Sequence, residues 1–137
     1  MQKEFLNPST LPNWSQSFSQ IVVVKSAGTR TVYLAGQVSV DAENKLIGEG
    51  DLEVQTEYAF RNLATALAAS GTTTADVVKL TIYIKSYRPE QAPIINNALR
   101  KYFPQDNLPT STWLGVESLA LEGLLIEIDA VAVVEGS

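Results

Sequence analysis

Two segments near the end of the chain decide its architecture: Leu108-Pro-Thr-Ser-Thr-Trp-Leu-Gly-Val116 and Gly123-Leu-Leu-Ile-Glu-Ile-Asp-Ala-Val-Ala-Val133. The first is a hydroxyl-rich run led by a proline, and the second is an apolar run that predicts a β-strand. Residues two apart on a strand point to the same face, so Glu127 and Asp129 share one face. A carboxylate in an aliphatic strand is costly to bury without a partner. Glu127 is therefore the first candidate for a chemical role.

The bulk composition predicts one folded domain. The 137 residues are enough for a substantial core, and 45% of them are hydrophobic against 18% charged. The formal net charge is −5 and no cluster of Lys or Arg occurs, which argues against nucleic-acid binding because that binding relies on basic groups. No apolar run approaches membrane-spanning length, and the first residues lack an apolar signal core. We therefore expect no membrane partner and a cytoplasmic location.

Histidine and cysteine are both absent from the sequence. Their absence excludes a Ser–His or Cys–His nucleophile pair, a disulfide, and a metal site built on imidazole or thiolate, in one chain or in a homo-oligomer of it. Acid–base chemistry would have to come from Asp, Glu, Lys or Tyr side chains, or from water. We expect no metal site and no cofactor.

The hydrophobic pattern predicts an α+β chain in the order β-β-β-α-β-α-β-β. We expect residues 1–17 to form an N-terminal arm and residues 18–137 to form a single domain. Asp51 is a candidate N-cap for the first helix, and Gly71 is in position to end it. The predicted strands cover 18–25, 30–40, 46–47, 77–85, 111–118 and 123–134, and the predicted helices cover 51–70 and 89–103.

Both helices are expected on one face of a mixed sheet, because crossovers between parallel strands share one hand. The other face then has no cover within the chain. Its expected residues are hydroxyls, an amide and small groups rather than charges, which favours contact with another subunit over an open wet surface. They are Thr31, Tyr33, Ala35, Gln37 and Ser39 on one strand and Thr81 and Tyr83 on another. We therefore expect a homo-oligomer with ligand pockets where subunits meet.

Several segments together resemble the Rid family (YjgF-like reactive intermediate deaminases, also called L-PSP-type). They are Phe18-Ser-Gln20, Val32-Tyr-Leu-Ala-Gly-Gln-Val38, Gly50-Asp51 with Gln55, Phe60-Arg-Asn-Leu63, Asp76-Val-Val-Lys79, Pro109-Thr-Ser-Thr112 and Gly123-Leu-Leu-Ile-Glu-Ile-Asp-Ala-Val-Ala132. No single motif is diagnostic, but their order and spacing cover nearly the whole chain. The resemblance implies a chorismate-mutase-like α+β fold and a homotrimer whose sheets form a barrel, with ligand clefts at the subunit boundaries.

The resemblance also implies a chemistry and a set of site residues. In the active branch of the family, an arginine after the Pro-x pair grips the carboxylate of a 2-imino acid. The strand glutamate helps to position a water that attacks the imine carbon, and ketoacid and ammonia are released. Glu127 matches that glutamate, and Asn96 matches an asparagine near the cleft. Ala35 and Gly36 match a small-small pair that lines the pocket.

Other positions depart from the family pattern. Phe18 stands where active members usually carry tyrosine, Ser111 stands where the arginine should be, and Trp113 replaces a small residue or cysteine. A serine cannot replace a bidentate guanidinium, and loss of such a contact would cost on the order of several kcal/mol. The departures therefore argue against efficient arginine-dependent deamination of 2-imino acids.

The function that we expect is binding of a small molecule in the intersubunit clefts. Phe18 and Trp113 would form apolar walls. Ser111 and Thr112 would donate hydrogen bonds, and Glu127 would bind an amine or orient a water. Without the arginine, a neutral or cationic ligand is favoured over a carboxylate. Glu127 could also act as a base in hydrolysis of an imine- or enamine-type bond if its apolar strand raises its pKa.

Three alternatives stay open at this point. The chain could be a 2-imino acid deaminase of low activity. It could be a non-catalytic interaction or chaperone-like protein, in which Glu127 is a structural carboxylate bonded to backbone amides. It could be a ribonuclease, although the acidic charge and the absent histidine argue against this activity. The run Thr110-Ser-Thr112 suits a strand start, and without a neighbouring base it predicts no nucleophile.

Overall fold

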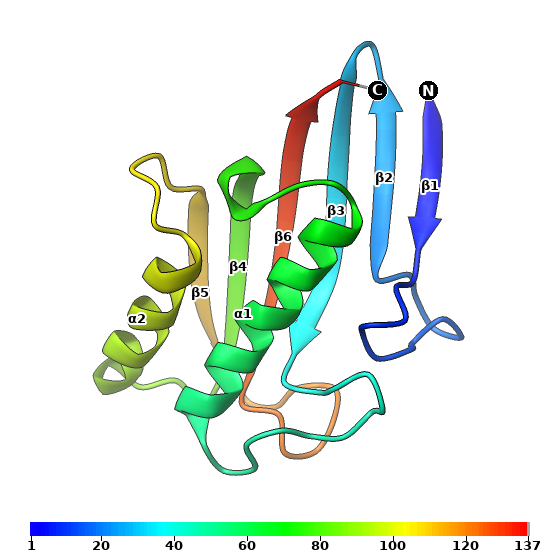
Figure 1. Ribbon diagram of the computed structural model, residues 1–137. Helices are drawn as coiled ribbons and strands as arrows, with labels where there is room; N and C mark the ends of the chain where they lie inside the picture. The colour runs from blue at the N-terminus through cyan, green and yellow to red at the C-terminus, as the bar shows by residue number, and fades with distance from the viewer. Residues whose placement is uncertain (137) are drawn as a thin grey trace.

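Six strands form one sheet in the order β1-β2-β3-β6-β4-β5 in the computed structural model, which describes residues 1–136 (Figure 1). Both α-helices lie on the same face of this sheet, as expected for the α+β class (Figure 1). The strands are β1 (Gln2–Leu6), β2 (Ile21–Ser26), β3 (Thr29–Val38), β4 (Val77–Lys85), β5 (Thr110–Val116) and β6 (Ile126–Glu135). The helices are α1 (Leu52–Ala69) and α2 (Ala92–Tyr102), with 3-10 turns η1 (Thr74–Asp76) and η2 (Pro89–Gln91).

Strand β6 lies inside the sheet, antiparallel to β3 on one side and to β4 on the other. Ile126, Ile128 and Ala130 point toward the helices and are at most 2% exposed. Glu127 and Asp129 alternate with them and point to the uncovered face. The strand therefore separates the apolar core from the two acidic side chains, as its sequence predicts.

Helix α1 begins and ends where the sequence predicts. Asp51 caps it by accepting a hydrogen bond from the Val54 backbone N–H at 3.1 Å. Gly71 follows the helix with a φ of 74°, a conformation that glycine adopts without steric cost. The second predicted helix is divided into η2 and α2. Within residues 1–136, no helix is long and apolar enough to cross a bilayer.

The expected N-terminal arm is partly wrong. Residues 2–6 form β1, which pairs antiparallel with β2 at the edge of the sheet. This strand was missed because its residues are largely exposed and polar, as is common on edge strands, and so lack an apolar pattern. The short strand expected at 46–47 is reduced to an isolated bridge between Val40 and Leu46. The order β-β-β-α-β-α-β-β is observed, but its first strand is the unpredicted β1, and the strand predicted at 46–47 is not one of the six.

A β-bulge in β3 changes which side chains face the open side of the sheet. Leu34 pairs with Ala130 and Gln37 pairs with Ile128, so β3 has one more residue than β6 over this interval. Gln37 therefore turns to the covered side, and it is 1% exposed. The prediction that Gln37 and Ser39 lie on the open face is wrong, because the extra residue reverses the alternation beyond it.

The reversed Gln37 side chain anchors the loop that precedes β2. Its Nε2 donates to the Oε1 of Gln20 at 2.8 Å. The Nε2 of Gln20 in turn donates to the carbonyl of Pro12 at 3.0 Å. At the bulge itself, the N–H of Ala35 donates to the carbonyl of Gln20 at 2.9 Å. The bulge and the loop are therefore held together by a short chain of amide hydrogen bonds.

Gln55 on α1 joins two loops at the end of the sheet. Its Nε2 donates to the carbonyls of Gly48 at 3.1 Å and Gly123 at 2.9 Å. Its Oε1 accepts from the backbone N–H of Leu125 at 2.8 Å. The side chain is fully buried, so these backbone groups have little access to replacement water.

We predict that Gln55→Met lowers the free energy of unfolding by about 2–4 kcal/mol, because it keeps the volume but leaves three backbone groups without their partner. Urea denaturation followed by circular dichroism measures the change. Gln16→Met, at an exposed position, is the matched control and should change stability by less than about 0.5 kcal/mol. A Gln55→Met protein as stable as the control would show that these bonds are unimportant.

Candidate functional site

The carboxyl group of Glu127 points into a pocket of about 210 Å³ at one end of the sheet. The floor comes from β3 and β6, and the walls come from the loop before β2 and the loop before β6. Glu127 is the pocket's single ionisable side chain, and most of the other lining residues are apolar. The lining consists of Trp14, Ser17, Phe18, Gly36, Val38, Ala120, Leu121, Leu124 and Glu127.

Gly36 is needed to accommodate the Glu127 side chain. A Cβ atom at position 36 would lie 2.7 Å from the Cγ atom of Glu127 and would collide with its carboxyl group. Real Cβ atoms do not approach other atoms this closely, so any larger residue would displace the glutamate. The family resemblance assigned Gly36 to the pocket lining. The structure adds that this glycine sets the position of the acid.

The Glu127 carboxyl is in an unfavourable place for a charge. Burial of the half-exposed side chain raises its pKa above the ordinary value, and the nearby charge of Asp129 raises the pKa further. Within residues 1–136, the only two ion pairs are Lys45–Glu43 and Lys101–Glu57, so no basic group compensates Glu127. No hydrogen bond contributes to its pKa either. Within one chain, Glu127 is therefore not a structural carboxylate that accepts hydrogen bonds from backbone amides.

Asp129 has a partner that Glu127 lacks. The hydroxyl of Tyr83 donates to Oδ2 of Asp129 at 3.1 Å. Tyr83 lies directly across from Glu127 in the β4–β6 ladder, so the three side chains share the open face. Burial, the hydrogen bond to Asp129 and the two carboxylate charges raise the pKa of Tyr83. Tyr83 therefore stays protonated and acts as a donor.

The aromatic wall of the pocket is formed by Trp14 and Phe18. Their ring centroids are 6.5 Å apart and their planes are tilted by 33°. Phe18 was predicted as a site residue, and it lines the pocket with Gly36 and Glu127. Trp14 was not predicted, because a single tryptophan in a loop carries no periodic signal. The position of Trp14 depends on the hydrogen bonds of Gln20 and Gln37 that hold this loop to the bulge.

The three predicted residues of β5 lie elsewhere in the chain. β5 is an edge strand, and β4 separates it from β6. The indole Nε1 of Trp113 donates to Oγ of Ser111 at 3.0 Å, and the Tyr87 ring contacts the indole edge-on. The register with β4 puts Ser111 and Trp113 on the covered side and Thr112 on the open side. Within one chain, none of the three lines the pocket around Glu127.

Two further predicted residues do not line the pocket either. Ala35 is partly buried at the bulge, where its N–H bonds to Gln20. Asn96 is exposed on α2, which covers the opposite face of the sheet. A single chain therefore brings together Phe18, Gly36 and Glu127, and leaves the other predicted residues apart.

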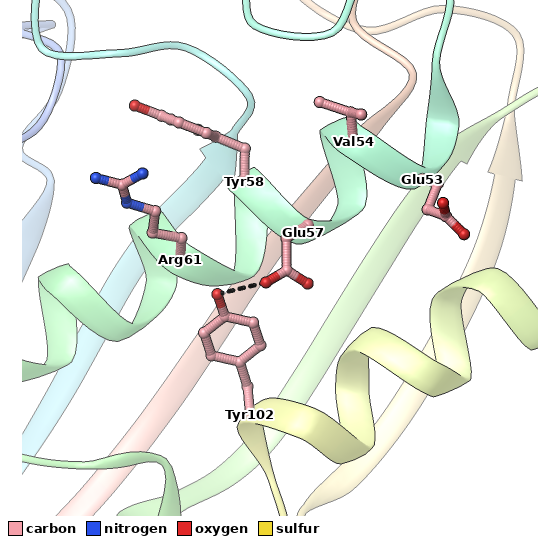
Figure 2. A pocket seen from close by; sticks show the side chains of 6 residues that line it. All are labelled: Glu53, Val54, Glu57, Tyr58, Arg61 and Tyr102. Carbon is pink, nitrogen blue, oxygen red and sulfur yellow. Dashed lines mark hydrogen bonds between the residues drawn. The ribbon is translucent and has the colours of Figure 1, made fainter.

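A larger hollow of about 470 Å³ lies on the outer side of α1, beside the end of α2 (Figure 2). Its central acid, Glu57, accepts from Lys101 Nζ at 2.6 Å and from the Tyr102 hydroxyl at 3.0 Å. The hydrogen bond from Lys101 lowers the pKa of Glu57 despite partial burial. Arg61 lies over the ring of Tyr58, 5.1 Å from its centroid. Glu57 and Arg61 already have partners, so this hollow is a weaker candidate than the pocket around Glu127.

Taken together, the mixed sheet, the two helices on one face and the strand glutamate define a protein of the chorismate-mutase-like, YjgF-like α+β class. The model of the family described as Endoribonuclease L-PSP matches residues 9–134. The chain therefore belongs to this family, the L-PSP or Rid family, and the resemblance read from its sequence is confirmed.

Two curated relatives and one solved structure illustrate what the chain is similar to. A 2-iminobutanoate/2-iminopropanoate deaminase of Dermatophagoides farinae is 29% identical over 133 residues, covering 97% of this chain and 98% of the relative. The rat protein of the same name is 30% identical over 131 residues, covering 96% and 90%. A crystal structure of a Rid-family protein of unknown function from Yersinia pestis is 26% identical with a TM-score of 0.83, covering 97% of this chain and all of that one.

We predict that Glu127→Gln makes the fold more stable near neutral pH. The folded-state pKa of Glu127 is raised above 4.5, so ionising this group disfavours the folded state at higher pH. The gain should shrink as the pH falls toward and below 4.5, where the carboxyl is protonated in both states. Chemical denaturation at several pH values measures it. Glu135→Gln, at an exposed site on the same strand, is the control. A marked loss of stability at neutral pH in Glu127→Gln would instead indicate a structural carboxylate.

Proposed function

We propose that this protein forms a homotrimer that binds a small molecule in clefts at its subunit boundaries and hydrolyses an imine-type bond there. The observation that carries the proposal is the Glu127 carboxyl, half-buried in an apolar pocket with a raised pKa and no partner within residues 1–136. A group with these properties can bind a cation or accept a proton from water.

The relatives support the type of reaction. Two of them are named 2-iminobutanoate/2-iminopropanoate deaminases, and both align with nearly the whole chain. Hydrolysis of an imine needs a base to take a proton from the attacking water and an acid to protonate the leaving nitrogen. A single carboxyl with a raised pKa can perform both transfers in turn.

The neighbourhood of Ser111 argues against the carboxylate grip of the active branch. By the family resemblance, Ser111 takes the place of the arginine. Trp113 donates its indole hydrogen to Ser111, so the ring lies beside the hydroxyl. No Lys or Arg lines the pocket around Glu127. A substrate carboxylate there would meet a negative charge with no neutralising partner, which disfavours a 2-imino acid by on the order of several kcal/mol.

The uncovered face of the sheet supports assembly. On this face the Tyr33 side chain is 50% exposed and the Val133 side chain is 39% exposed. Val131 on β6 lies at the centre of the face, between β3 and β4. Phe5 on β1 extends the same row beyond Val22. A face with this apolar content is typical of a surface that contacts another subunit. Because β5 is an edge strand, a neighbouring subunit that meets its free edge would give Ser111 and Trp113 a route to a cleft that they cannot reach within their own chain.

We predict that the wild type does not accelerate ketoacid release from freshly generated 2-imino acids, and that Ser111→Arg combined with Trp113→Ser gains at least about tenfold, or about 1.4 kcal/mol. The second change removes the indole that lies beside position 111. Thr110→Arg adds the same charge one residue away, on the opposite face of β5, and should gain nothing. Activity in the wild type would support the alternative of a low-activity deaminase and would mean that another group holds the carboxylate.

We predict that the wild type has a mass in sedimentation equilibrium of three times the 14.9 kDa chain. Val131→Arg puts a charge at the centre of the open face and should dissociate the assembly. Val54→Arg adds the same charge at an exposed position on α1 and should leave the trimer intact. A monomeric wild type, or a Val131→Arg variant that remains a trimer, would rule out assembly through this face.

A further inference from the structure

We propose that the pocket around Glu127 selects a small protonated imine that carries an apolar group and no carboxylate. The inference rests on the proposed function and names its substrate class. Such an imine is the first product when a primary amine is oxidised, so the reaction that supplies the substrate would be an amine oxidation rather than an amino-acid oxidation. The product would be an aldehyde or a ketone.

The charge of the pocket favours a cation. Glu127 is its only ionisable lining residue, and the neighbouring Asp129 adds a second negative charge on the same face. The hydroxyl of Tyr83 is already bonded to Asp129 and lies outside the lining, so it does not reduce the negative charge of Glu127. A bound cation would give Glu127 the partner that it lacks, whereas a bound carboxylate would increase the repulsion.

The walls favour an apolar substituent. Trp14 and Phe18 present two tilted aromatic rings, and Val38, Leu121 and Leu124 complete the lining. Phe18 is 46% exposed and Leu121 is 43% exposed, so apolar surface is available for a ligand to cover. Aromatic faces also attract a cationic head group, especially when water is excluded. An ionised substituent would have no polar partner against these walls.

The volume of the pocket within one chain indicates the size of the group that binds beside Glu127. The pocket measures about 210 Å³, below the range of roughly 300–1,000 Å³ that is typical of sites for drug-sized ligands. It corresponds to about seven water molecules at their volume in the liquid. A single aromatic ring or a short aliphatic chain bearing the imine is therefore the expected size.

The chemistry balances without a cofactor. The Glu127 carboxylate takes a proton from water as the oxygen bonds to the iminium carbon. The resulting neutral carboxyl gives this proton to the nitrogen, and the carbon–nitrogen bond breaks as ammonia leaves. The hydroxyl proton of the intermediate passes to ammonia through solvent. Iminium and water thus become an aldehyde and ammonium, with no change in oxidation state.

Binding is tested first, with three probes of one size: benzylamine, benzamide and phenylacetate. The chain has two tryptophans, so comparison with the spectrum of Trp113→Phe identifies the indole N–H signal of Trp14, which is then followed in the wild type by NMR. We expect benzylamine to shift this signal with a Kd at least tenfold lower than that of phenylacetate. Glu127→Gln should raise the benzylamine Kd at least tenfold, whereas Glu135→Gln should leave it unchanged.

Turnover is tested next with the imine formed from benzylamine by a flavin-dependent amine oxidase. Benzaldehyde release should be at least tenfold faster with the wild type than with Glu127→Gln, while 2-imino acids are not accelerated. Phenylacetate binding as tightly as benzylamine would overturn the substrate class but leave small-molecule binding in place. If no probe shifts the Trp14 signal, both this inference and the proposed function fail.

Discussion

The rest of the structure depends on β6, an interior strand with apolar side chains on one face and two carboxylates on the other. Both edges of the strand are hydrogen-bonded, to β3 and to β4, so the strand cannot leave the centre of the sheet. Its covered side contributes isoleucines and alanines to the core beneath α1 and α2, and that packing fixes its register. Once the register is fixed, Glu127 and Asp129 must lie on the other side. The hydrophobic core therefore holds the Glu127 carboxyl in a position that is unfavourable for its charge.

Two glutamates in this chain illustrate how surroundings decide the use of a side chain. Glu57 lies in the larger hollow, but Lys101 and Tyr102 satisfy its carboxylate and the pKa is lowered. Glu127 lies in a smaller pocket, has neither kind of partner, and its pKa is raised. A comparison of the volumes of these two hollows would favour Glu57. Glu127 is the better candidate because its carboxyl has no positively charged or hydrogen-bonding partner and a ligand could supply one.

Sequence reasoning recovered the elements whose patterns are local. The alternation in β4 and β6 and the cap at Asp51 predict the observed elements closely, because side-chain period and capping act over a few residues. The elements that were missed depend on long-range contacts. β1 is a strand because β2 lies beside it, and Trp14 lines the pocket because Gln20 and Gln37 hold its loop. The bulge had only one local signal, Gly36 within an otherwise regular strand. The predicted residues of β5, Ser111, Thr112 and Trp113, could reach the pocket around Glu127 only from a second chain.

The bulge in β3 also restricts how this protein can evolve. The same extra residue brings Gly36 beneath the glutamate and turns Gln37 toward the loop that carries the aromatic wall. Deleting one residue there would restore regular pairing, but it would remove the floor of the pocket and the anchor of its wall in a single step. The two features must therefore be inherited together. Diversification among relatives should be easier at Phe18 or in the loop before β6, where a side chain can change without moving the backbone.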